Sequence, residues 1–279
     1  MNFFERLQYI DRRIMYVLLA MVIAAPLIWV IHQPVKVSPA VHKAYDTVED
    51  MPPNKLAVIV IYWGSGTMAE TGPQTAALIR HLFLLNKRFA LVAFDPQGSK
   101  FAYDSALTIG NELGKKYGTD WVHWGYKPPA NLLPLLQSFP RDVVRAMVAD
   151  INGTPLAKVP AMKGIKTIRD IGLIADVTSV GELDMWIAYV YGPYRTAIVY
   201  CPTAVIAPEG YNPLDAGQIK GMLPGLQGAA AYERLLHIEG FATKAMGPLS
   251  TSHVLIILLI VVGNVGYVSS RRRRGTSEQ

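Results

Sequence analysis

The segment LAVIVIYWGSGTMAETGPQTAALIRHLFLLNKRFALVAFD, residues 56–95, contains the clearest indication of the fold class. It begins with a continuous apolar run, residues 56–63, which is typical of a strand buried on both faces of a parallel sheet. A glycine-rich turn follows, then a helical pattern over residues 72–86, and then a second apolar run over residues 89–95. Strand, helix and strand in this order predict a βαβ unit.

The same alternation continues toward the C-terminus. Three further strands are expected, at residues 121–125, 170–178 and 196–201. Three further long helices are expected, at residues 101–117, 181–191 and 214–239. Prolines interrupt residues 126–169, which we interpret as an insertion or lid with short helices at 132–137 and 142–151. We therefore predict an α/β domain whose doubly wound, mostly parallel sheet of about five strands is Rossmann-like or flavodoxin-like.

Apolar segments at both ends of the chain are long enough to cross a membrane. Residues 14–31 carry no charge and exceed the apolar region of a cleaved signal peptide, so we expect an uncleaved anchor. Residues 249–270 form the second expected transmembrane helix. Arginines precede the first segment, and four more follow the second at 271–274. The positive-inside rule therefore predicts two cytoplasmic termini in the cell membrane and an extracytoplasmic domain over residues 32–248.

The terminal segments complete this organisation. Residues 1–13 place Phe3, Phe4, Leu7 and Ile10 at helical spacing, which fits either an amphipathic segment in the membrane interface or an extension of the first anchor. Residues 271–279 form a cytoplasmic basic tail.

The composition excludes several classes of protein. The chain is 51% hydrophobic and 17% charged, whereas charged residues make up about a quarter of an ordinary soluble domain. Its net charge of +6 does not indicate a nucleic-acid partner, because residues 32–248 hold 20 basic and 18 acidic residues. One cysteine, Cys201, rules out an internal disulfide, and the six histidines show no metal-ligand spacing. We expect no metal and no cofactor.

The predicted sheet places a candidate ligand site at the carboxyl ends of its strands, where open α/β sheets bind ligands. The first strand-end loop contains neither G-x-G-x-x-G nor a P-loop ending, so it is a weak nucleotide signature. Turn formation and helix capping are the more common explanation for any single polar residue of this rim, whereas the group as a whole fits a ligand site equally well. The candidate ligand-binding residues are Ser65, Gly66, Thr67, Asp95, Lys127, Asp176, Thr178, Cys201 and Thr203.

A hydrolytic interpretation of this rim is also open. It would use Ser65 or Cys201 as nucleophile, with Asp95 or Asp176. Ser65 lacks the G-x-S-x-G elbow, and a lone cysteine that ends an apolar strand is most often a small buried residue.

A glycine pattern lies close to the second anchor. Gly217, Gly221 and Gly225 recur every four residues within the expected helix 214–239, and Gly228 continues the series. Such a face permits close approach of another backbone, either the domain's own sheet or another subunit. Asn264, inside the second apolar segment, could hydrogen-bond to a partner helix. These five residues are the candidate interface.

Three segments carry a resemblance, namely IDRRIMYVLLAMVIAAPLI, KAYDTVEDMPP and GQIKGMLPGLQGAAAYE. In their combination the chain resembles a family of uncharacterised prokaryotic membrane proteins with two anchors and an extracytoplasmic α/β domain. The resemblance covers most of the chain and implies an architecture but no activity.

Three functions follow from the sequence, in order of preference. The first is a non-enzymatic assembly or accessory subunit of a membrane complex, whose partners are the lipid bilayer and other membrane subunits or further copies of the chain. The second is a membrane-tethered binding or sensor domain for a small polar ligand. The third is an extracytoplasmic hydrolase.

Overall fold

The computed structural model describes residues 11–28 and 35–276, and the chain divides into two compact units. The first unit, Val35–Thr243, is an α/β domain. The second unit comprises Met1–Pro34 and Lys244–Gln279, and its described part is helical.

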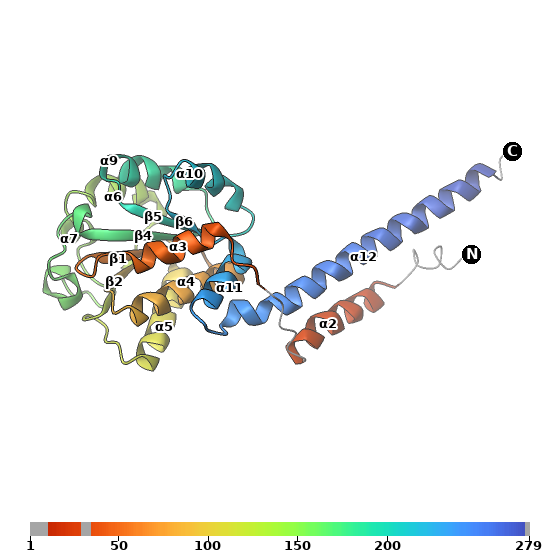
Figure 1. Cartoon of the computed structure of the whole chain (residues 1–279), viewed down its shortest axis with the longest axis horizontal. Coiled ribbons are helices and arrows are strands. Elements are labelled where there is room, and N and C mark those ends of the chain that lie inside the picture. The colour runs from red at the N-terminus through yellow and green to blue at the C-terminus, as the bar shows by residue number, and fades with distance from the viewer. Residues whose placement is uncertain (1–10, 29–34, 277–279) are drawn as a thin grey trace. The chain divides into compact units, whose positions relative to one another are not determined.

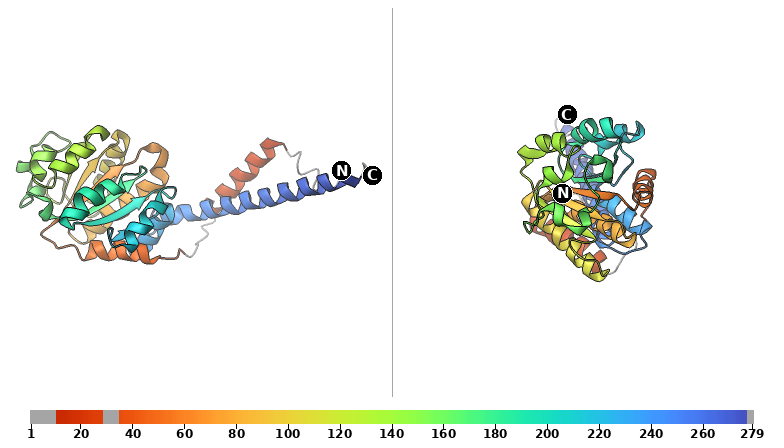
Figure 2. Two further views of the ribbon diagram at one scale, coloured as in Figure 1. Left: turned by 90° about the horizontal axis from the view of Figure 1, so that it is seen from above. Right: turned by 90° about the vertical axis from the view of Figure 1, so that its left-hand side faces the viewer.

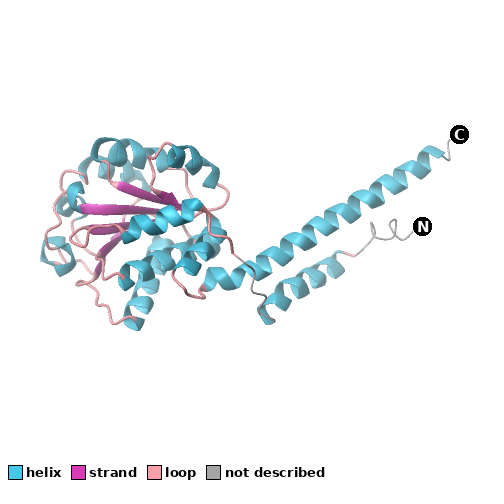
Figure 3. Ribbon diagram, viewed as in Figure 1, coloured by secondary structure: helices cyan, strands magenta, loops and turns pink. Residues whose placement is uncertain are grey.

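A six-stranded, fully parallel sheet forms the centre of the α/β domain, in the order β3-β2-β1-β4-β5-β6 (Figures 1 and 3). Its strands are β1 Leu56–Tyr62, β2 Phe89–Ala93, β3 Trp121–Tyr126, β4 Ile171–Thr178, β5 Ala197–Pro202 and β6 Gly221–Met222. This arrangement confirms the predicted α/β class and parallel sheet. The strand order reverses between β1 and β4, which are hydrogen-bonded neighbours.

Helices cover both faces of the sheet (Figures 1 and 2). One layer contains α3 Pro39–Glu49, α4 Met68–Leu84, α5 Pro96–Glu112 and α11 Gly225–Leu235. The opposite layer contains α6 Leu132–Ser138, α7 Val143–Met147 and α8 Leu183–Trp186. Because both faces are covered, alternate residues of a strand enter different cores: Val60 packs in one core with Leu135 and Trp186, while its neighbour Ile61 is buried on the other side.

Short connecting elements account for the remaining chain of the domain. A π-helix, Ile187–Tyr191, and α9, Gly192–Tyr194, extend α8 toward β5, where one helix over residues 181–191 was expected. The predicted insertion over residues 126–169 contains α6 and α7 together with short 3-10 turns.

Helix α5 begins five residues earlier than the sequence pattern predicted. The Asp95 carboxylate accepts hydrogen bonds from the Gln97 and Gly98 N–H groups, both at 2.8 Å, and Pro96 occupies the first helical turn. An aspartate before a proline is a favourable helix start, because proline has no N–H left unpaired at this position. Asp95 is therefore a helix cap in this structure.

The expected helix over residues 214–239 is wrong. The chain instead forms α10 Tyr211–Asp215, then strand β6, then α11. Gly217 adopts a φ of +69°, in the left-handed region, and follows directly after α10. Gly221 lies in β6, where a Cβ atom would come 2.2 Å from the Ala44 nitrogen of α3. The glycines therefore do not share one helical face.

Helix α12, Phe241–Thr276, begins within the α/β domain, and its residues from Lys244 onward belong to the helical unit. Within it, Phe241–Val268 is long and apolar enough to cross a membrane, with a mean hydropathy of 2.1 in its most apolar window. It begins earlier than the predicted span 249–270. It is the one such helix in the described ranges 11–28 and 35–276.

The N-terminal anchor is not shown. The described helix α2, Arg12–Ile28, has 17 residues and is shorter than the usual span of about 20. Residues 29–31 of the expected first span lie outside the described residues, as do residues 1–10 of the expected amphipathic segment and residues 277–279 of the basic tail.

Candidate functional site

The rim at the carboxyl ends of the strands contains most of the residues predicted to bind a ligand. Ser65, Gly66 and Thr67 form a 3-10 turn after β1, and Thr178 ends the neighbouring strand β4. The N–H of Ser65 donates to the Gln97 side chain at 3.2 Å, which joins the β1 and β2 ends of the rim.

Structural hydrogen bonds occupy several groups of this rim. Lys127 Nζ donates to the Met147 carbonyl at 3.1 Å, and burial lowers the pKa of this amine. The Thr178 hydroxyl donates to the Val180 carbonyl and accepts from the Val180 N–H, both at 3.0 Å. With Asp95 capping α5, Ser65 and Asp95 do not form the nucleophile–acid pair that a hydrolase would need.

Cys201 and Thr203 flank Pro202, the last residue of β5, and Gln74 of α4 contacts the chain at this point. Gln74 Nε2 donates to the carbonyls of Pro202 and Leu223, at 2.9 and 2.7 Å. Cys201 is fully buried, and burial raises the pKa of its thiol well above the ordinary value. A thiolate is the reactive form of cysteine, so this buried thiol is unsuited to be a nucleophile.

Beneath the rim, at the point where the strand order reverses, lies a buried carboxyl pair formed by Asp176 and Glu182. Asp176 lies on β4, in register between Val60 of β1 and Tyr200 of β5, and is completely buried. Glu182, which precedes α8, is only 4% exposed. All four carboxyl oxygens are buried without a hydrogen-bond partner of normal geometry in the described structure.

Burial controls the protonation of this pair. It raises the pKa of Asp176 to about 7 and, together with the negative charge of Asp176, the pKa of Glu182 to about 10. Near neutral pH the pair therefore holds at least one proton, because two carboxylates in a shared dry site repel each other. The pair can store a proton, but in this conformation its oxygens do not face solvent.

Two side chains of the hydrophobic core on this face of the sheet also carry buried polar groups. The Tyr200 hydroxyl and the Trp186 indole N–H are also buried without partners in the part of the chain that the structure describes. Burial and the charge of Asp176 raise the pKa of Tyr200. Buried polar groups are rarely left unpaired, so these groups are exceptions that call for an explanation.

Sequence reasoning identified Asp176 but missed Glu182. The available signal was weak, because Glu182 follows Thr178, Ser179 and Gly181 in what looks like an exposed turn. The structure turns this carboxyl group back under the rim.

A histidine–hydroxyl contact joins β3 and α5. His123 on β3 is fully buried, and its Nε2 atom lies 3.1 Å from the Ser99 hydroxyl of α5. The Gly125 N–H donates to His123 Nδ1 at 2.8 Å, so the ring proton resides on Nε2. Burial lowers the pKa of His123 to about 4. The imidazole therefore donates toward Ser99 and does not act as its base.

No group of three or more His, Cys, Asp or Glu side chains that could hold a metal ion occurs among the described residues.

No known protein family, no curated protein and no solved structure matches this chain. The resemblance to twin-anchored membrane proteins therefore stays a prediction, and the candidate site is defined by its own geometry.

Proposed function

We propose that this chain is a two-pass membrane protein whose α/β domain acts as a non-enzymatic accessory or assembly subunit of a membrane complex. A helical hairpin, α2 with α12, would anchor the domain, and both termini would lie in the cytoplasm. The strand order is that of Rossmann sheets rather than flavodoxin-like ones, which supports a Rossmann-like domain.

One contact within the helical unit carries the anchoring proposal. Pro26 of α2 has no N–H, so the Val22 carbonyl loses its usual partner four residues later. The Thr251 hydroxyl of α12 lies 3.1 Å from this carbonyl, and shares its proton with two carbonyls of its own helix. Threonine side chains satisfy proline-freed carbonyls in this way inside membranes, where water is absent.

The surface of α12 supports a partner beyond the chain itself. Only 6% of its most apolar window is buried, so lipid or other helices must cover the rest. Asn264 is exposed on this helix, and its amide donates to the Ile260 carbonyl of the preceding turn at 2.8 Å. The remaining amide oxygen is an acceptor that another transmembrane helix could satisfy.

Two measurements test the proposal. The topology is tested with three variants that each introduce one cysteine, Asn2→Cys, Ala130→Cys and Ser277→Cys, and a membrane-impermeant maleimide. The cysteine at position 130 should react in intact cells. The cysteines at positions 2 and 277 should react only after the cells are permeabilised. The buried native Cys201 supplies an unlabelled background. Reaction of either terminal cysteine in intact cells would contradict the two-pass topology.

The native mass of the gently extracted protein tests the subunit role. We expect an assembly that contains other polypeptides, and Asn264→Leu should release them while Val261→Leu, on the same helix, should not. A lone monomer from wild-type membranes would refute the subunit proposal.

A second candidate is a tethered binding or sensor domain, favoured by the unpartnered carboxyl pair at the strand-order reversal. Asp176→Asn should then abolish binding of a small polar ligand that the wild-type domain retains. The extracytoplasmic hydrolase has less support, because Cys201 is buried and Asp95 caps a helix.

A further inference from the structure

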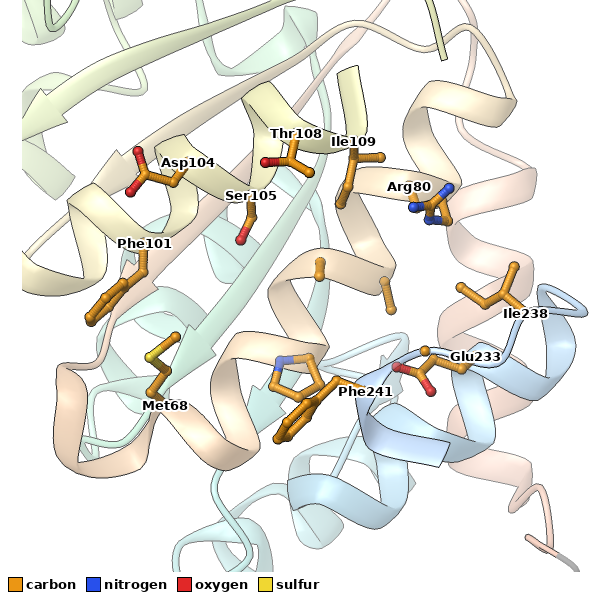
Figure 4. Close-up of a pocket in the computed structure, with 14 residues that line it drawn as sticks. Met68, Arg80, Phe101, Asp104, Ser105, Thr108, Ile109, Glu233, Ile238 and Phe241 are labelled. Atoms are coloured by element: carbon orange, nitrogen blue, oxygen red, sulfur yellow. The ribbon is translucent and has the colours of Figure 1, made fainter. Parts of the chain in front are cut away.

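A groove of about 400 Å³ lies between α4 and α5, at the start of α12 (Figure 4). Met68, Pro73 and Ala76 of α4 form one wall, and Phe101 of α5 forms part of the other. Phe241, the first residue of α12, completes the groove and is 62% exposed. This volume is in the range of small-molecule sites.

The groove is amphipathic. Asp104, Thr108 and Arg80 lie along the upper edge in Figure 4, beside Phe101 and Ile109. Met68 and Phe241 lie along the lower edge. The apolar part continues into an adjoining hollow of about 420 Å³, lined by Trp63, Ala69 and Gly72. The groove therefore suits a ligand with a long apolar portion and a polar end.

The polar side of the groove is largely built into the domain. Arg80 is paired with Glu112 at 2.5 Å. The buried Glu233 accepts from the Ala242 and Thr243 N–H groups, at 3.1 and 2.8 Å. These contacts hold the start of α12 at the groove and keep Arg80, which is still partly exposed, in place on its polar side.

The position of Phe241 in the sequence indicates where an occupant comes from. Phe241 is both a lining residue of the groove and the first residue of the candidate span Phe241–Val268. The chain that completes the groove therefore runs directly into the segment expected to be in contact with acyl chains. Large exposed apolar patches on a protein mark sites of interaction with other proteins or with membrane lipid.

We propose that this groove binds one acyl chain of a membrane phospholipid. The tail lies against Met68, Ala76, Phe101 and Phe241, and the polar end of the lipid lies toward Arg80 and Thr108. This inference rests on the membrane anchoring proposed above, and it adds a lipid site on the α/β domain.

Photolabelling in vesicles tests the site. The full chain is reconstituted with phosphatidylcholine that carries a diazirine in one acyl chain, irradiated and mapped by peptide mass spectrometry. We expect labelled peptides from α12, and also from residues 68–76 and 101–105. Labelling of α12 reports insertion into the bilayer, so anchoring and groove occupancy are read separately.

Groove-filling variants give the matched comparison. Ala76→Phe should remove the labels on α4 and α5 and keep those on α12. If Ala76→Phe fails to fold, Ser105→Phe fills the groove from the α5 wall and should have the same effect on the labels. Ala130→Phe, at an exposed position outside the groove, should keep every label. Wild-type labelling of α12 alone would overturn the lipid site and leave the anchoring intact. Unchanged α4 labelling in a folded groove variant would overturn it as well, and no labelling anywhere would refute both.

Discussion

Replacing Glu182 by glutamine should stabilise the protein at alkaline pH and leave it nearly unchanged at pH 5. Burial raises the pKa of Glu182 from 4.5 to about 10, so between these values the folded protein binds more protons than the unfolded chain. The free energy of unfolding then falls as pH rises through this window. Asp176 adds a second, narrower window, from 3.8 to about 7.

The magnitude follows from the two protonation states of Glu182. Each pH unit between the unfolded and the folded pKa costs about 1.4 kcal/mol, so at pH 8 the full effect is about 5 kcal/mol. Glutamine cannot ionise, and its amide can still donate to Asp176. Because the two carboxyl groups are coupled, we expect a gain of about 2–5 kcal/mol at pH 8, or roughly 5–15 °C in Tm.

The assay is thermal and urea unfolding of the full chain in detergent, followed by tryptophan fluorescence, at pH 5 and pH 8. Glu209→Gln provides the control, since this glutamate is exposed beside the same loop and its loss should leave the pH slope unchanged. An unaltered slope in Glu182→Gln, or a loss of stability at pH 8, would refute the assignment of a shared proton to this pair.

Three further predictions concern packing and reactivity. Glu233→Ala should lower the free energy of unfolding by about 2 kcal/mol, because the first turn of α12 loses its carboxylate cap. Faster hydrogen exchange at the Ala242 and Thr243 amides would report this loss locally. Glu233→Gln should lower the free energy of unfolding by less. Gly221→Ala should lower the free energy of unfolding in urea by about 3 kcal/mol. The control, Gly66→Ala, should change it by less than about 0.5 kcal/mol, because no atom lies near a Cβ at that position. Equal effects of the two substitutions would contradict the close approach of α3 to β6. Cys201 should resist alkylation in the native protein and react only at the rate of unfolding, so rapid native labelling would disprove its burial.

The sheet was predictable because a buried parallel strand has a simple signature. β1 and β2 are continuous apolar runs, and the predicted positions of the strands agree with the structure to within two residues at either end. β6 escaped prediction because it has two residues and contains a glycine. The early start of α5 was missed because its cap, Asp95, was assigned to a ligand site instead.

The candidate site was less predictable, because it depends on which way a side chain turns. Asp176 and Thr178 could be placed at the end of β4 from the strand pattern alone. Glu182 could not be paired with Asp176 from the sequence, because hydrogen bonds to the Tyr62 carbonyl and the Thr178 hydroxyl set the path of residues 179–181. The protonation of the pair arises only from this three-dimensional contact.

The glycine series after α10 shows why a regular spacing is insufficient evidence for a helix. Gly217 has a positive φ after α10, Gly221 admits the backbone of α3 against β6, and Gly225 has a positive φ where α11 begins. Gly228 lies against the backbone of Leu223, where a Cβ atom would come 2.5 Å from the Leu223 carbonyl carbon. Each glycine is explained by its own local geometry within the α/β domain. A role of these residues in binding another subunit would therefore need a surface that their own packing leaves open.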